Sequence, residues 1–284
     1  MNKQTNLLEI HTAVLLFGLA GLFGKWLIEL SPITIVLGRV FFASLTLAIF
    51  LLFSKQSLNI SPAKNYLILI FLGLILSIHW ISFFKSIQVS TVAVGLLSFS
   101  SYPIFTTFLE PLILKEKIIK PNIAFSFLCV MGIFLIVPRF EIKESIFTGV
   151  LWGLLSGLTF SLLTILNRKL TQNFSSLAIA FFEDFFALIF LLPSFFILHP
   201  TLSINNLILL LLLGIFCTAI SHTLFINGMK YIKAQTASII NSLEPVYGII
   251  FAFFLLHEIP SLRTIVGGTV ILCSQAVIVF KTLS

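Results

Sequence analysis

Long apolar runs, each of roughly 20 residues, fill most of this chain and are separated by short polar segments. A helix that crosses the hydrocarbon core of a bilayer needs about 20 mostly apolar residues. Of the 284 residues, 58% are apolar and only 10% are charged, whereas soluble domains carry about 25% charged residues. The sequence therefore predicts an all-α integral membrane protein and leaves little chain for a soluble catalytic domain.

Ten such runs predict ten transmembrane helices. Helices are expected rather than barrel strands, because the runs are long and show no period-two alternation. The first run is too long for a signal peptide and lacks an A-x-A cleavage site, so it is predicted to be an uncleaved span. The predicted spans are 7–30, 33–53, 66–84, 91–114, 122–137, 146–166, 174–198, 207–226, 235–256 and 262–280.

Basic residues are distributed unequally between the two ends of these spans. With the N-terminus inside, eleven inner basic residues face four outer ones, and the positive-inside rule places both termini in the cytoplasm of a bacterial-type inner membrane. The net charge of +7 comes from scattered residues and indicates no nucleic-acid binding. The expected partners are a small solute and the lipid bilayer, and a homodimer is left open. The inner residues are Lys3, Lys55, Lys64, Lys115, Lys117, Lys120, Arg168, Lys169, Lys230, Lys233 and Lys281, and the outer ones are Lys85, Arg139, Lys143 and Arg263.

An internal repeat emerges when the chain is compared with itself at a shift of 142 residues. The segment PIFTTFLEPLILKE from Pro103 then falls on PVYGIIFAFFLLHE from Pro245, and each proline precedes a glutamate, Glu116 or Glu258, by thirteen residues. Five helices in each half is an odd number, so the halves must have opposite orientations in the membrane. The sequence predicts two inverted five-helix repeats, at 5–138 and 146–281.

These motifs resemble the drug/metabolite transporter superfamily, in particular its ten-helix members with two EamA domains. The resemblance rests on Trp152-Gly153, Arg39, SLEPVYGIIFAFFLLHEIPSL from Ser242 and the Gly267-Gly268 helix, and it covers almost the whole chain. It implies alternating access around a cavity lined by helices one to four and six to nine, with the fifth and tenth at the periphery. It also implies export or exchange of amino acids, drugs or other metabolites. The adjacent acids Glu183 and Asp184 depart from the pattern expected of a generic member.

Glu244 is a candidate functional charge near the middle of the predicted ninth helix, where a charge costs about 2.5–3.5 kcal/mol. Asn241 lies on the same helix face. Pro245 removes a backbone donor, so the helix is expected to bend or unwind there, and Pro103 is the matching predicted hinge in the first half. The position of Glu244 in that half is taken by Tyr102. Glu244 either binds substrate or a proton, or forms a structural hydrogen bond to a neighbouring helix.

Glu183 and Asp184 lie near the middle of the predicted seventh helix and cannot both face the same way. Coupled carboxylates would suit proton binding or attraction of a cationic group. Alternatively, one pairs with a basic residue such as Arg39 and the other faces a wet vestibule. Arg39 itself either binds an anion or forms a structural pair. Lys25 lies on a small-residue face of the first helix, where another helix or a solute can approach, or it extends outward to the interface.

Histidines and large aromatic residues complete the candidate site. His79 and Trp80 lie in the third predicted helix, and Trp80 falls on His222 of the eighth at the repeat shift. Histidine could hydrogen-bond across helices or report pH. Tyr102 and Trp152 could wall a cavity. Ordinary packing is the alternative for each of these residues.

We therefore predict a secondary transporter, an exporter or exchanger of small polar or amphipathic metabolites such as amino acids, with proton coupling as an option. No cofactor or metal is expected, because Cys129, Cys217 and Cys273 lie singly in apolar runs. A channel or sensor is the first alternative. An intramembrane enzyme is the second, although no HExxH, GxSxG or P-loop motif supports it.

Overall fold

The computed structural model describes the backbone of residues 3–54, 58, 60, 62–115, 120–137, 141 and 143–283. In this part of the chain all regular structure is helical. Glu116 of the predicted repeat, and the basic residues Lys55, Lys117 and Arg139, lie outside the described residues. The helices are α1 (Lys3–Trp26), α2 (Pro32–Ser54), α3 (Lys64–Val89), α4 (Val92–Phe99), α5 (Tyr102–Leu114), α6 (Lys120–Ile136), α7 (Ser145–Leu170), α8 (Ser176–Leu198), α9 (Ile204–Gly214), the π-helix η1 (Ile215–Ile220), α10 (Ser221–Gly228), α11 (Ala234–Asn241), α12 (Glu244–Leu256) and α13 (Leu262–Leu283).

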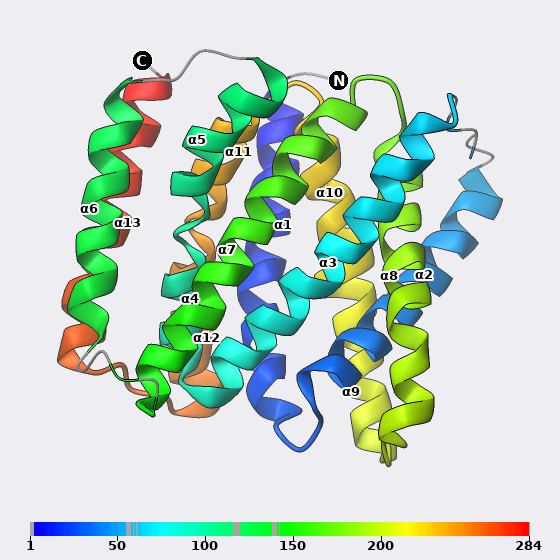
Figure 1. The fold of residues 1–284 in the computed structure, drawn as a ribbon, viewed down its shortest axis with the longest axis horizontal. Coiled ribbons are helices and arrows are strands. Elements are labelled where there is room, and N and C mark those ends of the chain that lie inside the picture. Colours follow the sequence, from blue (N-terminus) through cyan, green and yellow to red (C-terminus); the bar gives the residue numbers. More distant parts are fainter. Residues whose placement is uncertain are drawn as a thin grey trace.

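The helices lie side by side as a bundle (Figure 1). Among the described residues, seven helical segments are long and apolar enough to cross a membrane. In this count α4 and α5 form one segment, and α9, η1 and α10 form another. Many large apolar side chains point outward, including Leu52 and Phe53, which are 80% and 83% exposed. An apolar exterior of this extent fits a lipid environment. The chain is therefore a multi-pass α-helical membrane protein.

Two predicted spans are interrupted, contrary to the continuous helices expected at 91–114 and 235–256. The first breaks at 100–101, between α4 and α5, and the second at 242–243, between α11 and α12. Pro103 and Pro245 lie in the first turn of α5 and α12, where a helix needs no amide donor. The prolines therefore begin new helices rather than bend existing ones.

Several further boundaries differ from the predicted spans by a few residues, among them the ends of α1 and α3. Helix α1 ends at Trp26, short of the predicted end at residue 30. Helix α3 continues to Val89, beyond the predicted end at residue 84, because its polar residues find partners on other segments of the chain. Ser86 Oγ donates to the Gly149 carbonyl oxygen at 2.6 Å, and Gln88 Nε2 donates to the Leu30 carbonyl oxygen at 2.9 Å.

Packing between helices follows a pattern that relates the two halves of the chain. Helix α1 packs along α10 and α12, and α7 packs along α3, α4 and α5. Helix α2 packs on α8, and α6 packs on α13 at one edge of the bundle (Figure 1). Helices α1 and α7 run in opposite directions, and the start of α1 lies at the same side of the molecule as the end of α13 (Figure 1).

Glycines allow two of these contacts to be close. A Cβ atom on Gly18 of α1 would lie 2.9 Å from Tyr247 Cβ of α12. A Cβ atom on Gly153 of α7 would lie 2.5 Å from Ser98 Cβ of α4. Any larger residue would force the helices apart, so α1 and α7 each approach a broken helix of the other half through glycine.

Candidate functional site

A cluster of buried charged and polar side chains lies between helices of the two halves. Arg39 of α2, Glu183 and Asp184 of α8, His222 of α10 and Glu244 of α12 are each at most 3% exposed. Charged groups are rare inside membrane proteins, because removing them from water is costly. Their convergence on one interior region defines the candidate site.

Arg39 is held by the π-helical segment of the second half. Its Nε donates to Thr218 Oγ1 at 2.9 Å, and its Nη2 donates to the Cys217 carbonyl oxygen at 2.8 Å. The guanidinium lies over the Trp80 ring, with Cζ 3.4 Å from the ring centroid, a geometry that favours a cation–π interaction. Nη1 has no hydrogen-bond partner among the described residues. Nη1 of this buried cation is thus available to bind another group.

The π-helix η1 provides both acceptors for Arg39. Thr218 Oγ1 also donates to the Leu213 carbonyl oxygen at 2.9 Å, which fixes the orientation of the hydroxyl. π-Turns are uncommon and occur frequently at functional sites. The turn therefore links α2 of the first half to the eighth predicted span through the guanidinium.

Glu183 and Asp184 point to different neighbours, as expected for adjacent residues on one helix. Glu183 Oε2 accepts from Asn167 Nδ2 at 3.4 Å and lies 3.5 Å from His222 Nε2. Asp184 is attracted electrostatically by Arg39. Its two carboxylate oxygens have no hydrogen-bond partner in the described part of the chain. A buried carboxylate without donors carries a large desolvation cost, which a proton or a cationic ligand would relieve.

Glu244 is the first residue of α12, directly after the break at 242–243. Asn241 Nδ2 donates to Glu244 Oε2 at 3.1 Å across that break. Arg39 also interacts electrostatically with Glu244. In the first half, Tyr102 occupies the corresponding position at the start of α5, and its hydroxyl donates to the Ser238 carbonyl oxygen of α11. Both broken helices therefore direct a polar side chain into the contact between the halves.

Aromatic rings surround one side of the cluster. His79 Nδ1 lies 3.0 Å from both the carbonyl oxygen and the hydroxyl of Ser156 on α7. The His79 ring also contacts Trp80, at a centroid distance of 4.5 Å, and Phe160, at 5.2 Å. Tyr102 packs against Phe160 at 5.0 Å. His79, Trp80 and Tyr102 thus belong to one aromatic wall next to Arg39.

Lys25 and Trp152 lie outside the cluster. Lys25 is at the end of α1, where its Nζ donates to the Ser90 carbonyl oxygen at 2.7 Å. Nearby, the Glu258 carboxylate accepts from the backbone amides of Val92 and Ala93 at 3.2 Å each. Trp152 is half-buried near the start of α7. Lys25 therefore ties helix ends together rather than entering the site.

Several functional candidates carry no signal that distinguishes them in the sequence. Thr218 and Asn167 are neutral polar residues within predicted spans, yet they hold Arg39 and Glu183. Asn227 Nδ2 donates to both Glu9 carboxylate oxygens at 2.9 Å, and Ser176 Oγ donates to Asn227 Oδ1 at 3.2 Å. This network ties α1, α8 and α10 together near the start of α1, away from the ties that Lys25 makes at its end.

Fold and site together define a multi-pass α-helical membrane protein with a charged interior. The sequence profile of the EamA-like transporter family matches residues 6–137 and 147–280. The chain belongs to the EamA-like transporter family, which confirms the resemblance based on the repeated motif.

Relatives of similar length carry the name uncharacterized transporter. One from Bacillus subtilis is 24% identical over 279 residues, which cover 96% of this chain and 89% of that protein. One from Helicobacter pylori is 27% identical over 290 residues, which cover 96% and 94%. A solved crystal structure, 15% identical, covers 99% of this chain and 98% of its own with a TM-score of 0.73, and this likeness concerns the fold alone. Family and relatives support a membrane transporter.

Proposed function

We propose that the protein is a secondary transporter that moves small polar or amphipathic metabolites, amino acids among them, by alternating access. The observation that carries the proposal is the buried cluster between the halves, in which Arg39 Nη1 and the Asp184 carboxylate are left without hydrogen-bond partners among the described residues. An ionic solute could form hydrogen bonds with both groups. Exporter and exchanger modes are both compatible with such a site.

We further propose ten spans in two inverted repeats, at 5–138 and 146–281. The support is threefold: the helix breaks at 100–101 and 242–243 are related by the same shift of 142 residues, α1 and α7 run in opposite directions, and the helix contacts of one half correspond to those of the other. In this grouping α4 with α5, α9 through α10, and α11 with α12 each form one span. Secondary transporters commonly place their site between such repeats.

A screen of mass-detected metabolites in proteoliposomes tests transport. We expect uptake or counterflow of at least one small zwitterion or amine that saturates with concentration. Conduction far faster than a carrier cycle would instead support a channel. Metal-dependent turnover of a lipid would support an enzyme, although among the described residues no group of three His, Cys, Asp or Glu side chains is placed to hold a metal.

Both termini are proposed to be cytoplasmic, in a bacterial-type inner membrane. Eleven basic residues lie on one side of the spans against four on the other, and the described ends of the chain lie at one side of the molecule (Figure 1). We expect a reporter enzyme that is active only in the periplasm to be inactive when fused at Ser284. An active fusion would place the C-terminus in the periplasm and contradict this orientation.

Proton coupling is proposed for the acidic pair on α8. We expect Glu183→Gln and Asp184→Asn to change the pH dependence of flux, since interacting buried carboxylates titrate together and removal of one alters the other. The measurement is initial flux against pH in proteoliposomes, with Glu144→Gln as control because Glu144 makes no capping bond at the start of α7. Unchanged profiles in both site variants would assign the pair to structure.

A further inference from the structure

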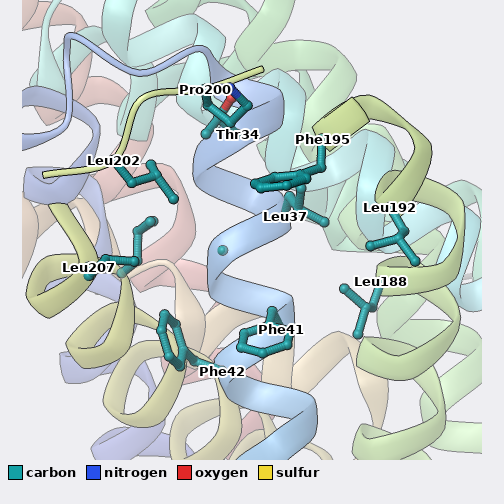
Figure 2. Close-up of a pocket in the computed structure, with 12 residues that line it drawn as sticks. Thr34, Leu37, Phe41, Phe42, Leu188, Leu192, Phe195, Pro200, Leu202 and Leu207 are labelled. Atoms are coloured by element: carbon teal, nitrogen blue, oxygen red, sulfur yellow. The ribbon is translucent and has the colours of Figure 1, made fainter. Parts of the chain in front are cut away.

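An apolar crevice opens between α2, α8 and α9, apart from the charged cluster. Its volume is about 300 Å³. Figure 2 shows Leu37 and Phe41 of α2 on one wall, Leu188 and Leu192 of α8 on a second, and Leu207 of α9 opposite. Phe41 and Leu192 are 48% and 47% exposed, so the crevice faces the surrounding lipid.

The depth of the crevice follows helix α2. Its lining extends along α2 from Thr34 to Phe42, which corresponds to about 12 Å of helix. At Gly38 the Leu210 side chain of α9 packs directly against α2, since a Cβ atom on Gly38 would lie 2.7 Å from Leu210 Cδ1. The space is therefore an apolar slot that extends along α2, a shape suited to one flexible hydrocarbon chain.

A second, polar pocket adjoins the slot where the helices end. Its volume is about 340 Å³, and it shares Thr34 and Pro200 with the slot. Helix α8 ends at Leu198 and α9 begins at Ile204, so the polar pocket lies toward the end of the bundle and the slot lies deeper. Its polar lining includes Glu29, Ser31, His199 and Asn206.

The charge of the polar pocket limits what can bind there. Among the described residues that line it, Glu29 is the single carboxylate, and none is a lysine or an arginine. An anionic headgroup would face this carboxylate without a fixed cation, whereas an ammonium group would be attracted to it. A soluble metabolite would leave the apolar slot empty.

We propose that the slot and the polar pocket form one binding site for a phospholipid with an ethanolamine headgroup. One acyl chain lies between α2, α8 and α9, and the ammonium lies beside Glu29. This lipid site is separate from the proposed transport function, and the proposal requires only that the chain lies in a membrane. It adjoins the α2 segment that carries Arg39, and a Cβ atom on Gly214 would lie 2.8 Å from the Arg39 carbonyl oxygen. A bound chain would thus support the packing of α2 that positions the guanidinium.

The test is native mass spectrometry of the detergent-purified full chain, titrated separately with phosphatidylethanolamine and phosphatidylglycerol of identical acyl chains. We expect phosphatidylethanolamine to be retained more tightly. Glu29→Gln should reduce this preference about 1.4–5-fold, the range expected for an exposed ion pair. Glu144→Gln, which removes a carboxylate elsewhere, should leave the preference intact.

A second variant tests the slot independently of charge. Leu192→Trp should fill it and weaken retention of both lipids, whereas Leu211→Trp on the exposed face of α9, outside the lining, should not. Equal retention of the two lipids by the unmodified chain would overturn the headgroup assignment. Unaltered retention by Leu192→Trp would overturn the site. Because the readout is lipid binding, either result is independent of whether a transported solute is found.

Discussion

Replacing Arg39 with lysine is expected to lower transport by about tenfold or more while folded protein remains in the membrane. Lysine keeps the positive charge but cannot reproduce the two directed bonds to Thr218 Oγ1 and the Cys217 carbonyl oxygen, nor the planar contact with Trp80. A hydrogen bond to a charged group contributes about 1.5–3 kcal/mol. The measurement is initial flux in proteoliposomes at matched protein content.

Arg168→Lys is the matched control, since the Arg168 side chain donates an exposed hydrogen bond to the Lys230 carbonyl oxygen at 3.3 Å. It should transport normally. Combining Arg39→Gln with Asp184→Asn should cost less activity than the two single effects added together, because each single change leaves the other buried charge uncompensated. Normal flux in Arg39→Lys would exclude the directed bonds from the mechanism, and strictly additive losses would exclude the coupling to Asp184.

The membrane fold could be predicted from the sequence because a bilayer imposes length and composition on every span. The helix breaks were only partly predictable. The repeated prolines indicated where the helix ladder is weak, but whether it bends or ends there depends on neighbouring helices. Likewise, α3 continues past its apolar run because Ser86 and Gln88 find carbonyl partners elsewhere, which local sequence cannot reveal.

For the site, the charged residues could be nominated because few charges occur within apolar runs. The neutral partners of these charges could not be nominated, since Thr218 and Asn167 resemble many other polar residues within spans. The π-turn that brings Thr218 to Arg39 had no sequence signal. Lys25 was nominated because it lies on a small-residue face of the first helix, yet it is close enough to the end of α1 to bind the Ser90 carbonyl oxygen instead.

Glu244→Gln is expected to lower transport sharply, by about tenfold or more, without loss of folded protein. Glutamine retains an acceptor oxygen for Asn241 Nδ2, so the bond across the break between α11 and α12 can persist while the charge is lost. The change therefore separates the charge of Glu244 from its structural bond. A buried charge costs about 2.5–3.5 kcal/mol in a membrane, and a protein that retains it without functional need would gain stability from the substitution.

The asymmetry of the repeat explains why the charge should matter. At the equivalent start of α5, Tyr102 makes its contact with α11 through a neutral hydroxyl, so a broken helix can be joined to its neighbour without a carboxylate. Glu244 instead interacts electrostatically with Arg39, the cation with an unpartnered Nη1 among the described residues. Flux is measured in proteoliposomes after monodispersity is checked in detergent, with Glu144→Gln as control. Near-normal flux would remove Glu244 from the mechanism. Aggregation would assign Glu244 to the fold, because it would show that packing between the helices requires the carboxylate and does not accept an amide.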